Sequence, residues 1–156
     1  MNKYFNGLTT VNVELTSRCN KDCWMCGRRK IDREHPELAM KYGDMEFGLV
    51  RSIAEQLPEG IVVQLHNNGE PLLYPRLKEA VRLFDRQIKC MDTNGKLIVK
   101  KSDEIIDNLD TLTISTFEND EESEEQYKLI KEFLKSKKNR KPNLIIRCLG
   151  DEELDK

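Results

Sequence analysis

Three cysteines close together in the chain, Cys19, Cys23 and Cys26, are the residues best suited to chemistry. They are spaced Cys-x3-Cys-x2-Cys and directly follow a stretch with the alternation of a β-strand. Cysteine thiolates are soft ligands that bind iron–sulfur clusters or zinc. A four-iron cluster is usually held by four cysteines, so three would leave one iron open to a further ligand. An open metal position is typical of a catalytic site rather than a structural one.

The alternatives to an iron–sulfur cluster fit this spacing less well. A structural zinc site needs four ligands, usually as two closely spaced pairs, and the nearest candidate for a fourth ligand is the isolated His35. Five cysteines, a highly charged composition and an N-terminus without a signal-peptide pattern argue against disulfides. We interpret Cys90 and Cys148, which fall inside predicted strands, as buried structural thiols. A non-catalytic binding domain stabilised by zinc or by a cluster is the alternative function.

The cysteine motif resembles that of the radical S-adenosylmethionine (SAM) enzymes, Cys-x3-Cys-x-Φ-Cys, in which Φ is usually aromatic. Here Met25 occupies the Φ position and Trp24 precedes it. The resemblance implies a 4Fe–4S cluster on the three cysteines, with SAM chelating the open iron and Trp24 and Met25 near its adenine. It implies reductive cleavage of SAM to a 5′-deoxyadenosyl radical that takes hydrogen from an unknown substrate, either a peptide or protein or a small molecule. It also implies an electron donor such as flavodoxin or ferredoxin.

A second segment, Asn68-Gly69-Glu70-Pro71, resembles the Gly-Gly-Glu-Pro turn of the same family. In the family this turn binds the amino group of SAM, and a glutamate is a suitable acceptor for an ammonium group. The wider run of residues 65–75 resembles the branch that often carries a SPASM or twitch extension, although we expect no such extension after the fifth strand. Asn94 and Ser115, at the ends of later strands, are further candidate SAM contacts. Ser115 could equally well satisfy its own turn.

The composition favours one cytosolic domain. The chain has 156 residues, about the length of one domain, and its 26 basic and 28 acidic residues are nearly balanced. Neither a nucleic-acid surface nor a membrane surface is indicated, and no apolar run is as long as a membrane span. We expect residues 1–156 to form a single radical SAM core domain in the cytoplasm, where reducing conditions suit an oxygen-sensitive cluster.

Strand-like and helix-like segments alternate along the chain. Strands are predicted at 11–15, 61–65, 88–91, 111–115 and 143–149, and the second is apolar enough to be buried on both faces. Helices are predicted at 45–57 with Asp44 as N-cap, at 77–84, at 98–109 with a candidate break near Ser102, and at 119–138. Tyr127, Ile130, Phe133 and Leu134 should form the buried stripe of the last helix. Residues 27–42 are predicted to be an exposed loop with at most a short helical turn.

This alternation predicts an α/β fold with a parallel sheet. A flavodoxin-like sheet would share the period, but every candidate motif falls at the carboxyl end of a strand, which favours a partial (β/α) barrel of about five strands with helices outside. The fifth strand should then expose an unpaired, apolar edge. We therefore expect that the chain either belongs to a longer protein or self-associates through this edge.

Overall fold

Five parallel strands form a single sheet in the computed structural model, which describes residues 5–117 and 120–149. The strands lie across the sheet in chain order, and each neighbouring pair is parallel. Their bounds are Thr10–Asn12 (β1), Val62–Gln64 (β2), Ile88–Thr93 (β3), Thr111–Phe117 (β4) and Asn143–Leu149 (β5). This order confirms the predicted open (β/α) arc. A flavodoxin-like sheet would instead have its first strand between two others.

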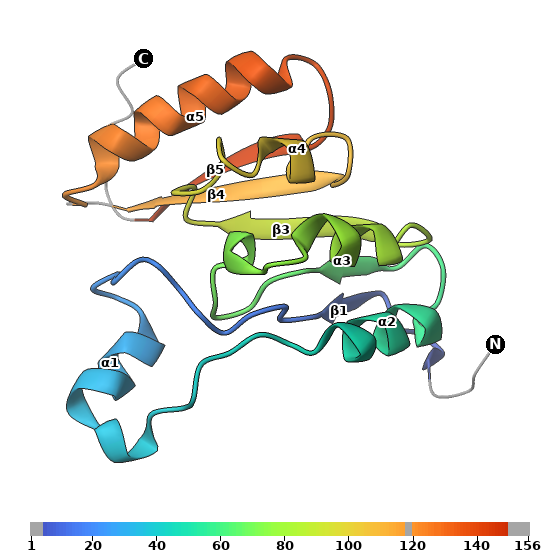
Figure 1. The fold of residues 1–156 in the computed structure, drawn as a ribbon, viewed down its shortest axis with the longest axis horizontal. Coiled ribbons are helices and arrows are strands. Elements are labelled where there is room, and N and C mark those ends of the chain that lie inside the picture. The colour runs from blue at the N-terminus through green and yellow to red at the C-terminus, as the bar shows by residue number, and fades with distance from the viewer. Residues whose placement is uncertain (1–4, 118–119, 150–156) are drawn as a thin grey trace.

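Helical segments connect successive strands. Their bounds are Gly27–Glu34 (α1), Pro36–Leu38 (η2, a 3-10 helix), Phe47–Gln56 (α2), Pro71–Leu73 (η3, a 3-10 helix), Leu77–Leu83 (α3), Ser102–Ile105 (α4) and Ser123–Lys137 (α5). Right-handed crossovers between parallel strands bring the connecting helices to the same face of a sheet. Figure 1 shows α1 apart from the other helices, beyond the carboxyl ends of the strands.

The apolar core lies between the sheet and the helices that cover it. Alternate residues of a strand point to opposite faces, so each strand contributes every second side chain to this core. Met91 of β3 and Leu112 and Ile114 of β4 are fully buried in this way. Phe84, at the end of α3, and Phe133 of α5 are the largest fully buried side chains that the helices bring. The side chains at the intervening strand positions therefore lie on the other face of the sheet.

The other face of the sheet is partly open and carries polar side chains, among them Gln64 and Asp92. The prediction that the second strand is buried on both faces is therefore wrong: Val63 is fully buried, but Val62 and Gln64 are partly exposed. Cys90 of β3 and Cys148 of β5 are also partly exposed rather than buried as predicted, and a structural role for these thiols stays a prediction. Because the arc of strands does not close into a barrel, no strand of the described chain covers this face.

Residues 27–42 depart from the predicted exposed loop, because α1 occupies the first eight of them and η2 follows. No residue of α1 is buried, so the apolar periodicity that would indicate a helix is missing. Ion pairs at helical spacing are present instead, from Arg29 to Asp32 at 3.8 Å and from Lys30 to Glu34 at 3.9 Å. Such pairs each stabilise a helix by only about 0.2–0.5 kcal/mol, which makes them a weak signal in a sequence.

Two other helices differ from their predictions at the ends. Glu46, not Asp44, caps α2 by accepting a hydrogen bond from the Leu49 N–H at 2.9 Å. The Asp44 carboxylate instead pairs with the Arg18 guanidinium at 2.8 Å. The helix predicted over 98–109 is reduced to the four residues of α4, which begins at the candidate break near Ser102. It ends where the backbone becomes extended at Ile106, and Asp107 then has a left-handed φ of 61°.

The buried stripe of α5 is rotated from the predicted one. Ile130 and Phe133 are buried as expected, but Tyr127 and Leu134 are exposed, and Gln126 and Lys137 take their places. Residues 126, 130, 133 and 137 share one face of a helix at the usual spacing. A buried glutamine needs hydrogen-bond partners, and the Gln126 amide donates to the backbone carbonyls of Asn94 and Ser115.

β5 is the outer strand next to β4, and its side chains Ile145 and Ile146 are about half exposed. Self-association through this strand stays a prediction. Among the described residues, no helix combines the length and apolar character needed to cross a membrane.

Replacing Leu112 by alanine tests the core. Leu112 is fully buried in the middle of β4, so the change should lower the free energy of unfolding by about 2–5 kcal/mol through lost burial and a residual cavity. Leu49→Ala on the exposed side of α2 is the matched control and should change it by no more than about 0.5 kcal/mol. Urea denaturation measures both, and equal losses would contradict the assignment of the core.

Candidate cluster and cofactor site

The three cysteines lie on the connection from β1 to α1, at the carboxyl ends of the strands. Cys26 is the N-cap residue of α1, and its N–H donates to the Cys23 carbonyl at 3.1 Å. The Arg29 guanidinium on α1 donates to the carbonyl oxygens of Cys19 at 3.1 Å and Lys21 at 3.4 Å. The loop is thus folded back onto the start of its own helix, with all three thiols free and partly buried.

Burial and nearby charges shift the pKa of the Cys23 thiol. Burial raises the pKa of the Cys23 thiol to about 11, the Lys21 ammonium lowers this pKa, and the charges of Cys19 and Cys26 raise it. In the described part of the chain, no three Cys, His, Asp or Glu side chains converge as ligands of a single metal ion would. A four-iron cube binds one thiolate per iron, so its ligands surround it rather than meet at a point. Three thiolates match the donor set of a four-iron cluster with one open iron, whereas a structural zinc site takes four protein ligands, and cluster binding by these cysteines stays a prediction.

The turn Asn68–Pro71 packs against the chain that enters the cysteine loop. The Glu70 N–H donates to the Arg18 carbonyl at 2.7 Å, next to Cys19. A Cβ atom at Gly69 would lie 1.8 Å from the Thr16 carbonyl oxygen and 2.9 Å from the Ser17 Cα. Only glycine lets the two backbones approach this closely. The cysteine motif and the turn, about 50 residues apart in the sequence, therefore form one unit.

Glutamate side chains hold this turn from both sides. The Glu14 carboxylate accepts from the N–H groups of Asn68 at 2.7 Å and Gly69 at 2.9 Å. Glu70 is only 2% exposed, and its carboxylate accepts from the Thr93 hydroxyl at 2.6 Å and the Asn94 N–H at 2.8 Å. Burial raises the pKa of Glu70, while these hydrogen bonds lower it. Glu70 therefore joins the ends of β2 and β3.

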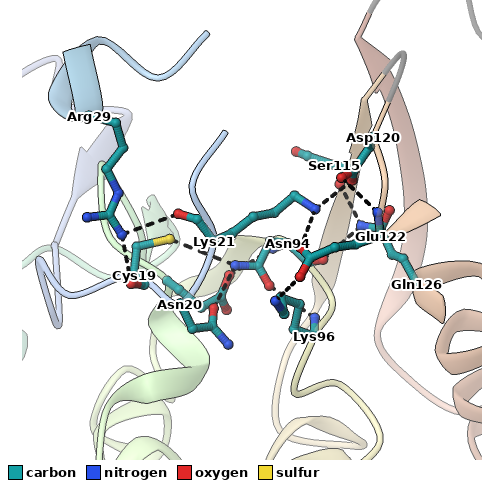
Figure 2. A network of polar contacts seen from close by, with 11 residues as sticks. Cys19, Asn20, Lys21, Arg29, Asn94, Lys96, Ser115, Asp120, Glu122 and Gln126 are labelled. Atoms are coloured by element: carbon teal, nitrogen blue, oxygen red, sulfur yellow. Dashed lines mark hydrogen bonds and ion pairs between the residues drawn. The ribbon is translucent and has the colours of Figure 1, made fainter. Parts of the chain in front are cut away.

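Asn94 links the third strand end to the cysteine loop. Its side-chain amide donates to the Asn20 amide oxygen at 2.9 Å and lies 3.9 Å from the Cys19 sulfur (Figure 2). Its own carbonyl accepts from the Gln126 amide at 2.8 Å. The structure thus places Asn94 next to a predicted cluster ligand, and its side-chain amide is hydrogen-bonded within the protein.

Ser115 lies near the end of β4, on the same strand end that Gln126 contacts. The Gln126 amide donates to the Ser115 carbonyl at 2.9 Å as well as to Asn94, so α5 is tied to two strand ends at once (Figure 2). The Ser115 side chain is partly exposed. In the sheet, Ser115 of β4 is paired with Arg147 of β5. Both readings of Ser115, as a cofactor contact and as a strand-end residue, remain predictions.

A cavity of about 320 Å³ collects much of the predicted site. Of the predicted residues it is lined by Cys19, Cys23, Gly69, Glu70, Asn94 and Ser115. Trp24 borders a second cavity, of about 560 Å³, between the cysteine loop and the start of α5, and is 69% exposed. Cys26, Met25, Asn68 and Pro71 line neither cavity. Met25 is exposed, whereas Pro71 is buried at the start of η3.

The 320 Å³ cavity also has a charged wall that the sequence did not indicate. The Arg147 guanidinium of β5 pairs with the Asp92 carboxylate of β3 at 2.6 Å. His66 accepts the Asp92 N–H on Nδ1 at 3.0 Å, so its Nε2 carries the proton and faces the same carboxylate at 3.5 Å. Burial lowers the pKa of His66, which keeps the imidazole neutral near pH 7.

The comparisons with known sequences point to one superfamily. No protein-family model matches the chain. A probable GTP 3′,8-cyclase of Methanococcus maripaludis is 30% identical over 132 residues, which are 82% of this chain and 42% of that protein. A tungsten-containing aldehyde ferredoxin oxidoreductase cofactor-modifying protein of Pyrococcus furiosus is 32% identical over 65% of this chain and 27% of that protein. An S-adenosyl-L-methionine-dependent 2-deoxy-scyllo-inosamine dehydrogenase of Niallia circulans is 29% identical over 65% of this chain and 40% of that protein.

These homologues are members of the radical SAM superfamily. The crystal structure of BtrN in complex with AdoMet and 2-DOIA has the same fold, with a TM-score of 0.62 and 17% identity over 94% of this chain and 58% of that chain. BtrN in an open conformation gives a TM-score of 0.58 at 16% identity. The chain spans less than half the length of each of the three sequence relatives.

Several residues of the site escape prediction even with the radical SAM motifs in hand. Gln126, Asp120 and Glu122 come from the α5 region, whose acidic start is typical of any helix N-terminus. Lys21 lies between two predicted cluster ligands, but nothing in the local sequence indicates its carboxylate partners. Their partners lie far away along the chain, so a local pattern carries no signal for them.

Replacing Gly69 by alanine tests the close approach of the turn to the cysteine loop. The new Cβ would meet a backbone oxygen, so the backbones must separate, and we expect the free energy of unfolding to fall by about 1–3 kcal/mol. At Gly43, in the same region, an added Cβ would meet nothing within 4 Å, so Gly43→Ala is the matched control. Urea denaturation compares the two. A Gly69→Ala protein as stable as the control would show that the turn does not pack against this loop.

Proposed function

We propose that this chain is a radical SAM catalytic core that binds one 4Fe–4S cluster through Cys19, Cys23 and Cys26 and binds SAM beside it. The observation that supports this most strongly is the contact between the cysteine loop and the turn Asn68–Pro71, through the Glu70 N–H and the Arg18 carbonyl. Two segments that resemble radical SAM motifs in sequence are thereby neighbours in space, at the carboxyl ends of parallel strands. This is where ligands bind in open α/β sheets.

The residues of the cysteine loop and of the Asn68–Pro71 turn, only some of which line the 320 Å³ cavity, have distinct tasks in this proposal. Cys19, Cys23 and Cys26 hold the cluster, and the Asn68–Pro71 turn presents polar backbone to the cofactor. Glu70 keeps that turn in register with Asn94. When bound, the cluster would supply the electron that splits SAM into methionine and a 5′-deoxyadenosyl radical able to abstract hydrogen from a substrate. An electron donor such as flavodoxin or ferredoxin, in a cytoplasmic setting, completes the proposal.

The proposed cluster can be tested by anaerobic reconstitution with iron and sulfide. The wild type should take up about four irons per chain, the number in one complete cube, with broad visible absorption. Replacing Cys19, Cys23 and Cys26 together by alanine should abolish both, because no thiolate ligand would remain in the loop. Replacing Cys90 and Cys148 by alanine is the matched control and should leave the iron content unchanged.

Uptake of one zinc and no iron by the wild type would contradict the proposal. It would favour the alternative of a small zinc-stabilised binding domain. Equal iron content in both cysteine variants would instead show that the iron is bound outside the proposed loop.

A further inference from the structure

Lys21 is a buried charge inside the cysteine loop. It lies between Cys19 and Cys23, and only 5% of its side chain is exposed. A buried ammonium group is costly unless it is paired and hydrogen-bonded. The Lys21 ammonium therefore needs acceptor partners, and these partners identify the segment to which the cysteine loop is attached.

The partners of Lys21 lie about 100 residues further along the chain. Its ammonium contacts the Asp120 carboxylate at 2.5 Å and the Glu122 carboxylate at 3.0 Å, both just before α5. Glu122 also binds Lys96, on the loop after β3, so the ion pairs form a chain (Figure 2). The Phe117 ring lies 5.9 Å from the Lys21 nitrogen.

This ion-pair chain holds a part of the cysteine loop that the Asn68–Pro71 turn does not contact. The Asn68–Pro71 turn contacts the loop before Cys19, through Arg18 and Thr16. Lys21 fixes the stretch between the first two cysteines to the connection from β4 to α5. The pair with Asp120, whose side chain is 12% exposed, is screened little by solvent and is stronger than a surface ion pair, whereas Glu122 is 42% exposed and its pair with Lys21 contributes less.

We propose that Lys21 is a positioning residue for the cluster: its ion pairs with Asp120 and Glu122 hold Cys19 and Cys23 in place for iron. The inference rests on the proposed function, since it assumes that these cysteines bind a cluster. It assigns a role to α5 and its preceding residues that the cysteine motif alone does not contain. Lys21 does not touch the reacting atoms and acts through the neighbouring cysteines.

The test compares Lys21→Met with Lys21→Arg after reconstitution. Loss of supporting contacts around metal ligands typically weakens metal binding about 10–100-fold, so iron should leave Lys21→Met for a chelator faster by about that factor. Lys21→Arg keeps the charge and should restore most of the retention, which a role in packing alone would not require. Lys30→Met is the matched control, because Lys30 forms only an exposed ion pair with Glu34 on α1.

A second readout needs no iron. Trp24 is the only tryptophan and lies three residues after Lys21, so its fluorescence anisotropy reports motion of the loop. Anisotropy should fall in Lys21→Met and stay unchanged in Lys30→Met. If Lys21→Met does not fold, as judged by circular dichroism, the same measurements on the double variant Asp120→Asn with Glu122→Gln decide the matter.

The inference is overturned if folded Lys21→Met, or the double carboxylate variant, keeps wild-type iron retention and wild-type anisotropy. A wild type that takes up no iron would contradict the proposed function instead. In that case a fall in anisotropy would still establish the attachment of the loop by Lys21, without a role in iron binding.

Discussion

The buried carboxylate of Glu70 is the contact on which the geometry of the candidate site depends. Its oxygens accept from the Thr93 hydroxyl, the Asn94 N–H and the Leu72 N–H, while its own N–H donates to Arg18. One residue thereby connects the ends of β2 and β3 with the start of the cysteine loop. An unmatched donor at this degree of burial would cost about 1–3 kcal/mol, so these loops are held in one arrangement.

The rest of the site is arranged around that contact. Asn94, fixed by Glu70, reaches Asn20 beside Cys19, and Gln126 ties the same residue to β4 and α5. Lys21 adds an ionic attachment on the far side of the loop. The loop carries little apolar surface of its own, with Trp24 exposed, so polar contacts rather than core packing position the cysteines. A loop held by polar contacts can leave its thiols partly exposed and still keep a fixed backbone arrangement.

The sequence predicts the sheet better than the details of the site. Alternating apolar segments identify all five strands, and the motif positions correctly favour chain order over a flavodoxin-like order. The contact between the cysteine loop and the Gly69 turn follows from the same topology. The helix α1 escapes prediction because none of its residues is buried, and the α5 stripe is misplaced because a polar residue, Gln126, occupies a core position. Both errors arise where polar contacts replace the apolar pattern on which prediction depends.

Reductive cleavage of SAM by the reconstituted protein tests the central claim most directly, and it needs no knowledge of the substrate. Incubation with SAM and dithionite, followed by chromatography, measures 5′-deoxyadenosine. A radical SAM core should form it together with methionine, and a protein lacking Cys19, Cys23 and Cys26 should form none. A wild type that carries a full cluster and binds SAM but produces no 5′-deoxyadenosine would contradict the account and indicate a non-catalytic domain.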